Sequence, residues 1–261
     1  MRKEPLLQGD NRVALITGAS RGIGKAIAQA LAEAGFRILF TYRSRTGEAR
    51  EVVGKISATG GIAHAIQADA GIPGGAQGIV QLGLETFGQI DVLVNNAGIS
   101  LARGPLAECS PADWEETLRV NLSGPFYLLQ AVLPHMRERA TGHIINISSN
   151  VTQRFPAALG PYTVSKAGLD ALTRILAKEE GPHGIRVNAV APGPIDTEML
   201  RHSLAVMGPE RAEAFIKSVP LGRTGYPEEI ASVVRFLVSD AASYITGQIL
   251  YVNGGGPGSL H

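Results

Sequence analysis

An apolar run that continues into a glycine-rich turn and then into a helical pattern constrains this chain more than any other feature. RVALIT occupies positions 12–17, GASRGIG follows at 18–24, and KAIAQALAEAG ends at Gly35, a residue that commonly stops a helix. A short apolar run of this kind is typical of a buried parallel strand. Strand, glycine turn and helix in this order predict the first unit of a dinucleotide-binding fold.

The glycines of this turn have separate predicted roles. Gly18 permits the tight turn, while Gly22 and Gly24 let the backbone approach a pyrophosphate and let the helix pack against the strand. The helix N-terminus would then face the phosphates, where its N–H groups and its dipole favour an anion. A glycine turn with a purely structural role is the alternative. The cofactor-binding candidates in this segment are Gly18, Ser20, Arg21, Gly22, Ile23 and Gly24.

The order of strand and helix recurs along the whole chain. Further strands are predicted at 36–42, 61–69, 90–98, 143–149, 185–193 and 248–256, and helices at 46–58, 73–87, 111–135, from Pro161 onward, at 196–218 and at 227–238. This alternation predicts an α/β fold with a single Rossmann-like, doubly wound parallel sheet of about seven strands and helices on both faces. One domain spans 1–261, because no repeat or linker divides the chain, and residues 1–10 are expected to form a flexible tail.

Composition excludes several classes of partner. The 261 residues have a formal net charge of +1, so the chain has no electrostatic footprint for nucleic acid or for an anionic membrane. Cys109 is the one cysteine, which excludes an intrachain disulfide and fits a reducing compartment. The first residues have no apolar core of signal-peptide length, and no run approaches the roughly 18 apolar residues of a membrane span. We therefore expect a cytoplasmic protein with no nucleic-acid partner, no membrane association and no metal site.

The end of the second predicted strand indicates which cofactor is bound. NAD-binding sheets usually place an acidic residue there for the ribose 2′-hydroxyl. This chain has Tyr42, Arg43, Ser44 and Arg45 instead, so no carboxylate repels a 2′-phosphate and arginines are available to bind one. Arg21 in the glycine turn would face the same ribose. These residues predict NADP(H), although ordinary solvated loop charges are the alternative.

Other cofactor contacts are predicted at the ends of later strands, where ligands bind in such sheets. Asp69 could bond the adenine amino group or simply cap its strand, and Asn95 would brace the loop that follows its strand. The Pro192–Gly193 turn could lie against a nicotinamide ring, whose carboxamide Ile195 and Thr197 could bond. The candidates from these segments are Asp69, Ala70, Asn95, Ala97, Gly98, Pro192, Gly193, Ile195 and Thr197.

A second group of residues carries the predicted chemistry. Tyr162 and Lys166 lie at i and i+4 of a predicted helix and therefore share one face. A nearby ammonium would lower the tyrosine pKa from about 10 towards the operating pH of a general acid. Ser149, at the end of an apolar strand, would bond the same substrate oxygen. Asn121, among apolar residues, has either a structural bonding role or the role of holding a water beside Lys166.

The chain resembles the short-chain dehydrogenase/reductase family over about 12–256. The features that carry this resemblance occur in the family's order and spacing: TGASRGIG at 17–24, NNAG at 95–98, Asn121, Ser149, YTVSK at 162–166 and APG at 191–193. The resemblance implies hydride transfer between a nicotinamide cofactor and a carbonyl/alcohol pair. It implies that Asn121, Ser149, Tyr162 and Lys166 form the catalytic tetrad, with Tyr162 and Lys166 also contacting the cofactor, and that the chain assembles as a homotetramer or homodimer.

Within the family, the chain is most similar to bacterial 3-oxoacyl-carrier-protein reductases, through TGASRGIG, the TYRS end of the second strand, and ITGQ near the C-terminus. Two basic positions thought to face the carrier protein are Ala140 and His183 here, which weakens the case for acyl carrier protein as a partner. Asn253 stands where the family usually has aspartate. The predicted function is therefore NADPH-dependent reduction of a ketone, including a 3-oxoacyl thioester. The alternatives are NADP-linked oxidation of a sugar, polyol or steroid alcohol, and a nucleotide-sensing protein without catalysis.

Overall fold

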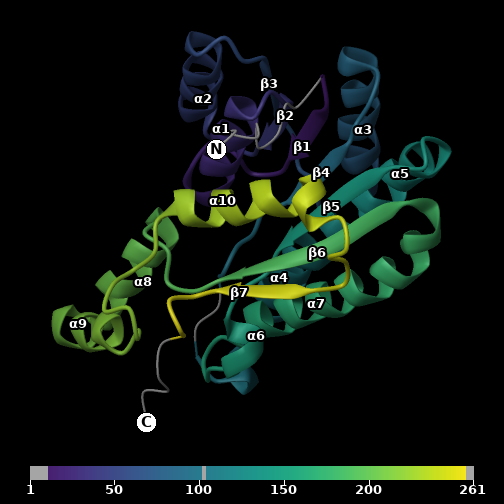
Figure 1. Ribbon diagram of the computed structural model, residues 1–261. Helices are drawn as coiled ribbons and strands as arrows, with labels where there is room; N and C mark the ends of the chain where they lie inside the picture. Colours follow the sequence, from purple (N-terminus) through teal and green to yellow (C-terminus); the bar gives the residue numbers. More distant parts are fainter. Residues whose placement is uncertain (1–10, 102–103, 257–261) are drawn as a thin grey trace.

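The computed structural model describes residues 11–101 and 104–256, so the tail predicted at 1–10 lies outside the described residues. Seven strands form one sheet in the order β3-β2-β1-β4-β5-β6-β7 (Figure 1). Every neighbouring pair is parallel, which confirms the predicted doubly wound α/β fold. The strands are β1 (Val13–Ile16), β2 (Arg37–Tyr42), β3 (Ala63–Gln67), β4 (Val92–Asn95), β5 (Gly142–Ile147), β6 (Ile185–Pro192) and β7 (Ile249–Val252).

Helices cover both faces of the sheet and separate the apolar core into two layers. Side chains alternate between the faces of a strand, so Ile16 and Leu15 of β1 belong to different layers. Ile16 packs in the layer formed by α1 (Gly22–Glu33), α2 (Thr46–Ala58) and α10 (Pro227–Leu237). Leu15 packs in the layer formed by α3 (Pro73–Phe87), α5 (Gly124–Glu138) and α7 (Gly160–Glu180). Burial on both faces explains why the central strands are apolar throughout.

The helix predicted at 111–135 is not continuous. The structure has α4 (Pro111–Leu118), a π-helical turn at Arg119–Ser123, and then α5. The predicted start is right, because Pro111 occupies the first turn and the Ser110 hydroxyl accepts a hydrogen bond from the Asp113 N–H at 3.0 Å. A single π turn within a helix often marks a functional site, and this one contains Asn121.

The segment predicted as one helix at 196–218 is also divided. Gly208, with φ of 82°, separates α8 (Glu198–Met207) from α9 (Pro209–Lys217). Figure 1 shows both helices projecting beyond the end of β6. A short helix, α6 (Val151–Arg154), follows β5 directly. None of the helices in the described part of the chain is long and apolar enough to cross a membrane.

The strand order places the site. β1 lies between β2 and β4, so the chain departs in opposite directions from this strand. In open α/β sheets, ligands bind in the crevice outside the carboxyl ends of the strands at such a switch point. The loops after β1, β4, β5 and β6 meet there, and they carry the glycine turn, Gly98, Ser149 and Gly193.

Candidate active site

A cavity of about 1390 Å³ lies at this edge of the sheet. It brings together nearly all of the predicted site residues, from the glycine turn to the first turn of α7. Asn95 and Asn121 are the two predicted residues that do not line it. The predicted residues that line the cavity are Gly18, Ser20, Arg21, Gly22, Ile23, Gly24, Tyr42, Arg43, Ser44, Asp69, Ala70, Ala97, Gly98, Ser149, Tyr162, Lys166, Pro192, Gly193, Ile195 and Thr197.

The glycine turn has the geometry of a phosphate cradle. Gly18 and Gly22 have φ values of 66° and 55°, which favour glycine. A Cβ on Gly24 would lie 2.4 Å from Asn96 Nδ2 and 2.6 Å from the Gly18 carbonyl oxygen, so no side chain fits where α1 packs against the turn. No side chain caps the N-terminus of α1. Its first N–H groups therefore point into the cavity as donors for an anion.

The residue that braces the glycine turn is Asn96, the neighbour of the predicted Asn95. Asn96 Nδ2 donates to the carbonyl oxygens of Thr17 and Gly18, at 2.8 and 3.1 Å. Asn95 instead donates to Asn146 Oδ1 of the neighbouring strand at 2.8 Å. Asn95 is the last residue of β4, and its side chain points along the sheet rather than out of its end. The period-two alternation of a strand places the next residue, Asn96, on the other side.

The arginines expected to bind a 2′-phosphate are already paired with carboxylates. Arg21 and Arg45 both contact Glu198, the first residue of α8; the Arg45 Nη2–Glu198 Oε1 distance is 3.0 Å. Arg43 reaches Glu116 Oε1 at 3.3 Å. In each pair, at least one of the two side chains is more than half exposed to solvent. Each ion pair therefore contributes little to stability. Glu198 was not predicted, because nothing in the sequence shows that α8 returns to the end of β2.

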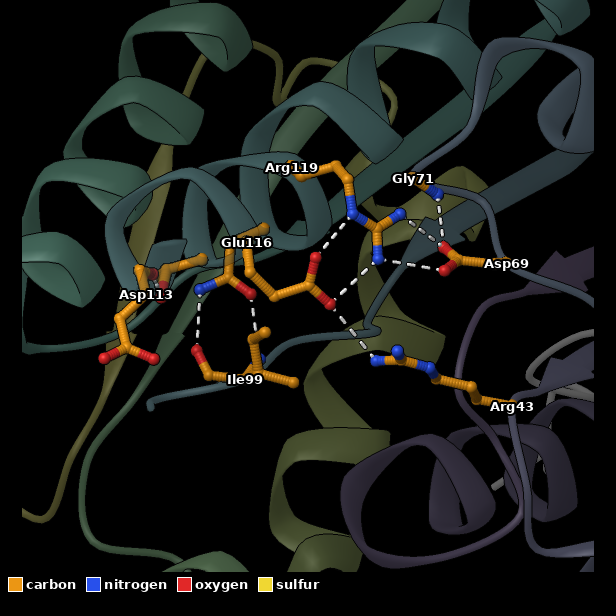
Figure 2. A network of polar contacts seen from close by, with 9 residues as sticks. Arg43, Asp69, Gly71, Ile99, Asp113, Glu116 and Arg119 are labelled. Atoms are coloured by element: carbon orange, nitrogen blue, oxygen red, sulfur yellow. Dashed lines mark hydrogen bonds and ion pairs between the residues drawn. The ribbon is translucent and has the colours of Figure 1, made fainter. Parts of the chain in front are cut away.

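Asp69 takes part in an ion-pair network at the end of β3. Arg119 lies between Asp69 and Glu116 and bonds both carboxylates, with Nη2–Oδ2 and Nε–Oε2 distances of 2.9 and 2.6 Å (Figure 2). Asp69 Oδ1 also accepts a hydrogen bond from the Gly71 N–H at 2.8 Å. The Arg119 hydrogen bonds hold the pKa of Asp69 below its usual value. The network connects the end of β3 to the π turn that follows α4.

Asn121 is fully buried in the π turn, and its amide has a structural role. Its Oδ1 accepts from the Ile99 N–H, and its Nδ2 donates to the Ile99 carbonyl and to Ser165 Oγ, at 2.8, 2.8 and 3.0 Å. A Cβ on Gly98 would lie 3.4 Å from both Asn121 Oδ1 and Lys166 Nζ, so Asn121 and Lys166 meet at this glycine. The water relay predicted for Asn121 stays a prediction.

Ser149, Tyr162 and Lys166 come together at the middle of the cavity. Ser149 follows β5, while Tyr162 and Lys166 occupy successive turns of α7. Lys166 is buried, and its Nζ donates to the Ile147 carbonyl at 2.8 Å and lies 5.8 Å from the centre of the Tyr162 ring. Burial lowers the pKa of Lys166 to about 8, and Asp170 opposes this shift. The arrangement places a phenol, a hydroxyl and an ammonium around one volume.

The predicted lowering of the Tyr162 pKa is not what the structure shows. Burial raises the pKa of the Tyr162 phenol above its ordinary value, and a hydrogen bond with Ser149 partly offsets that rise. Lys166 does not lower it, because its ammonium is directed to the Ile147 carbonyl rather than to the phenol. Tyr162 is therefore protonated at neutral pH, the form that can donate a proton.

Helices α8 and α9 form a wall of the cavity and not part of the core. Met199, Leu200, Met207 and Phe215 line the cavity. Within α8 and α9, all of which the structure describes, only Ser203 is buried. Core packing therefore does not explain these apolar residues, which instead form a cover over the site. Among the cavity residues that sequence reasoning missed are Asn96, Asn150 and Glu198.

Comparisons with known proteins agree with this site. The family model described as "Enoyl-(Acyl carrier protein) reductase" matches residues 18–256. A 3-oxoacyl-[acyl-carrier-protein] reductase from Aquifex aeolicus is 43% identical over 255 residues, which cover 95% of this chain and 98% of the relative. The chain belongs to the short-chain dehydrogenase/reductase family. It is an oxidoreductase of that family, whose members use a nicotinamide cofactor.

Solved structures of short-chain dehydrogenases superpose on the whole chain. A 7α-hydroxysteroid dehydrogenase complexed with NADH and 7-oxo glycochenodeoxycholic acid has a TM-score of 0.93 and 34% identity, with 100% of both chains covered. A putative NAD(P)-dependent gluconate 5-dehydrogenase from Beutenbergia cavernae, with bound NADP, has a TM-score of 0.89 and 37% identity, covering 97% of this chain and 98% of the other. The family thus includes proteins bound to either cofactor.

Proposed function

We propose that this chain uses NADPH to reduce a ketone to a secondary alcohol, with Tyr162 as the proton donor. The observation that carries the proposal is one cavity that is lined both by the glycine turn and by Ser149, Tyr162 and Lys166. The fit to a dinucleotide is good, because Gly24 has no room for a side chain and the N–H groups at the start of α1 have no side-chain cap. The cofactor, when bound, supplies the hydride.

Each reacting residue has a defined task in this mechanism. Ser149 and Tyr162 hold the carbonyl oxygen by hydrogen bonds, which stabilise the negative charge that develops when hydride reaches the carbon. Tyr162 then gives its phenolic proton to that oxygen, so the carbonyl becomes an alcohol and the phenol becomes a phenolate. Lys166, whose ammonium lies 5.8 Å from the centre of the Tyr162 ring, then supplies a proton to the phenolate. Tyr162 can serve as the donor because its phenol, whose pKa burial raises, holds its proton at neutral pH.

NADP(H) is the proposed cofactor because three arginines and no free carboxylate surround the end of β2. Arg21, Arg43 and Arg45 line this end of the cavity. The B. cavernae relative carries NADP, whereas the steroid dehydrogenase carries NADH, so family membership alone does not choose between the two. Arg21, Arg43 and Arg45 favour the phosphorylated form.

The Aquifex relative suggests a 3-oxoacyl thioester as one substrate. The two positions at which carrier-protein contacts were expected, Ala140 and His183, come before β5 and β6. They therefore lie at the amino edge of the sheet, opposite the cavity. An acyl carrier protein remains a proposed partner without support from these residues. Oxidation of a sugar, polyol or steroid alcohol uses the same residues in reverse and is the second candidate, favoured by the gluconate and steroid dehydrogenases in the family.

The test of this proposal is Tyr162→Phe, which removes the hydroxyl and keeps the ring. NADPH oxidation should be screened against ketones, 3-oxoacyl thioesters, sugars and steroids. Turnover of a good substrate should fall by roughly 10²–10⁴, the usual contribution of a positioned proton donor. NADPH binding, followed by fluorescence, should stay near the wild-type value.

Tyr244→Phe is the control, because Tyr244 is fully exposed and does not line the cavity. This variant should keep full turnover. Ser149→Ala should lose turnover while still binding NADPH, and Lys166→Ala should lose both. A folded Tyr162→Phe enzyme within about threefold of the wild-type kcat would contradict the mechanism.

A further inference from the structure

Two buried hydrogen-bond donors without an acceptor lie in the cavity near Ser149. They are Arg154 Nε and Asn150 Nδ2, and neither finds a partner among residues 11–101 and 104–256. Both residues line the cavity. Buried donors in folded proteins are almost always paired, and leaving a donor of a charged group unpaired costs more than leaving a neutral one. The two atoms therefore mark a place where a ligand supplies acceptors.

The backbone positions both donors firmly beside the reacting serine. Asn150 precedes α6 and Arg154 ends it, so the two lie at i and i+4 and share a face. The Val151 N–H points to Ser149 Oγ at 3.4 Å, and the Asn150 N–H donates to the Pro192 carbonyl at 2.9 Å. The start of α6 is thus fixed to the end of β6, which sets where the backbone of Asn150 lies beside Ser149.

No acidic side chain compensates the charge of Arg154. Burial lowers the pKa of Arg154, and no acidic group opposes this shift. Three carboxylates of the same cavity are held by other arginines: Asp69 by Arg119, Asp196 by Arg201 and Glu198 by Arg21 and Arg45. A fourth, Glu228, lies in the first turn of α10 and does not oppose the lowered pKa of Arg154. Within the described chain, the cation of Arg154 is therefore available to a ligand.

The other polar residues of this region do not compete for that role. Gln153 and His202 are polar residues of α6 and α8, the two helices that border this region. Both are exposed and neither lines the cavity. Of the three residues, Arg154 is the one that lines it. Apolar residues, including Leu159, Met199 and Phe215, form the surrounding wall. A cation without a carboxylate partner beside apolar residues favours one anionic group on an otherwise apolar skeleton.

We propose that Asn150 and Arg154 bind a carboxylate carried by the substrate, so that the substrate is an oxo acid rather than a neutral ketone. This inference rests on the proposed function, in which Ser149 holds the carbonyl oxygen. A carboxylate offers only acceptors, and the Nε edge of a guanidinium binds one through two parallel hydrogen bonds. The phosphates of a thioester's carrier arm lie many bonds from the reacting carbonyl, whereas α6 follows Ser149 directly. The anion therefore belongs to the reacting skeleton itself.

Matched acid and ester substrates test this subsite in the full-length enzyme. The pairs are 4-oxopentanoate and 5-oxohexanoate against their methyl esters, which keep the ketone and remove the charge. We expect the wild type to have a higher kcat/KM for the acids. In Arg154→Met the acid-to-ester ratio of kcat/KM should fall roughly 10- to 100-fold, the effect of a lost charge-assisted hydrogen bond. Asn150→Ala should lower the ratio by about 3- to 10-fold, as for a neutral donor.

Gln153→Ala is the matched control, because Gln153 lies in the same short helix but outside the cavity. It should keep the wild-type acid-to-ester ratio. A wild type that prefers the esters, or an Arg154→Met variant that loses acid and ester turnover equally, would overturn the proposal. An equal loss would mean that Arg154 only supports the fold of α6.

A binding measurement separates this proposal from the proposed function. Hexanoate has the carboxylate but no ketone, so it cannot accept hydride. Millimolar hexanoate with NADP⁺ should raise the melting temperature of the wild type and of Gln153→Ala, but not that of Arg154→Met. If hexanoate binds in this pattern while no ketone is reduced, the subsite stands and the proposed reaction fails. If hexanoate stabilises wild type and Arg154→Met alike, the subsite fails whatever the enzyme reduces.

Discussion

Lys166 shows, at the scale of one residue, how the site opposes the stability of the fold. Its ammonium is buried, and its pKa is about 8 in the folded chain against 10.5 in the unfolded one. Below pH 8 the lysine is protonated in both the folded and the unfolded chain. The folded chain is then destabilised by the full free energy of burying the charge. Between pH 8 and 10.5 the folded chain releases the proton and the unfolded chain keeps it. The free energy of unfolding therefore rises with pH in this window.

The prediction is a pH-dependent difference between the wild type and Lys166→Met. From pH 7 to pH 9.5, the wild type should gain about 2 kcal/mol of stability relative to the variant. The hydrogen bond to the Ile147 carbonyl is missing from the variant at both pH values, so its loss does not affect this change. Denaturant unfolding at both pH values measures it. Lys178→Met, an exposed substitution on the same helix, should follow the wild type. Parallel pH curves for wild type and Lys166→Met would show that Lys166 is not a buried cation.

Cofactor choice is also decided by single residues, and Glu198 acts against the arginines. Glu198 occupies Arg21 and Arg45, which a 2′-phosphate would need. Glu198→Gln should therefore raise kcat/KM for NADPH several-fold and change the value for NADH much less. Arg43→Ala should lower kcat/KM for NADPH by roughly 10- to 100-fold, since a charge-assisted hydrogen bond contributes about 1.5–3 kcal/mol.

Steady-state kinetics with each cofactor measure both effects. Glu210→Gln is the control for the lost glutamate charge, because Glu210 is exposed on α9 and does not line the cavity. A wild type that prefers NADH would contradict the proposed cofactor. An unchanged kcat/KM for NADPH in Glu198→Gln would show that the ion pairs of Glu198 with Arg21 and Arg45 do not weaken NADPH binding.

At the scale of elements, local signals decided which parts could be predicted. The helix predicted at 73–87 matches α3, because Pro73 fits a first turn and Gly88 adopts the left-handed conformation of a helix stop. The π turn at Arg119–Ser123 has no such signal. It depends on Asn121 reaching Ile99 and Ser165, which are distant in sequence. Asn95 and Asn96 could not be distinguished from sequence for the same reason. The two side chains are identical and adjacent, but one bonds Asn146 and the other bonds the glycine turn.

Helices α8 and α9 should be the least stable elements of the described chain. They pack mainly against each other, and Met199 and Val206 are 47% and 63% exposed. Elements with few buried apolar contacts open at low free energy. In hydrogen exchange, the amides of α8 and α9 should exchange much faster than those of α7 and become protected when NADPH binds. If the amides of α8 and α9 in the free enzyme were protected as strongly as those of α7, the two helices would not form a moving cover. Helix α2 is the control, because NADPH should leave its exchange unchanged.

The whole molecule has an apolar surface that the single chain does not cover. Val164, Ala171 and Ile175 lie along one face of α7, with Val164 43% and Ile175 52% exposed. On the same helix, Ala171 is exposed and Ala167 is half-buried, whereas Leu172 packs partly against the core. The sequence could indicate this helix but not which of its residues the core already uses, since that depends on how α7 is rotated against the sheet.

We predict that this face of α7 pairs with the same face of a second chain. A two-fold interface buries identical surfaces, so Val164, Ala171 and Ile175 would meet their copies. Light scattering at micromolar concentration should give two or four times the 27.4 kDa of one chain. Ile175→Glu should shift the mass towards the monomer, because it buries an unpaired charge at the proposed interface. Ile62→Glu, at a residue that is 51% exposed beside the β3 edge of the sheet, should keep the assembly intact. A wild-type mass of one chain would show that the apolar face of α7 is not an interface. If Ile62→Glu alone dissociated the assembly, the interface would lie at the β3 edge of the sheet instead.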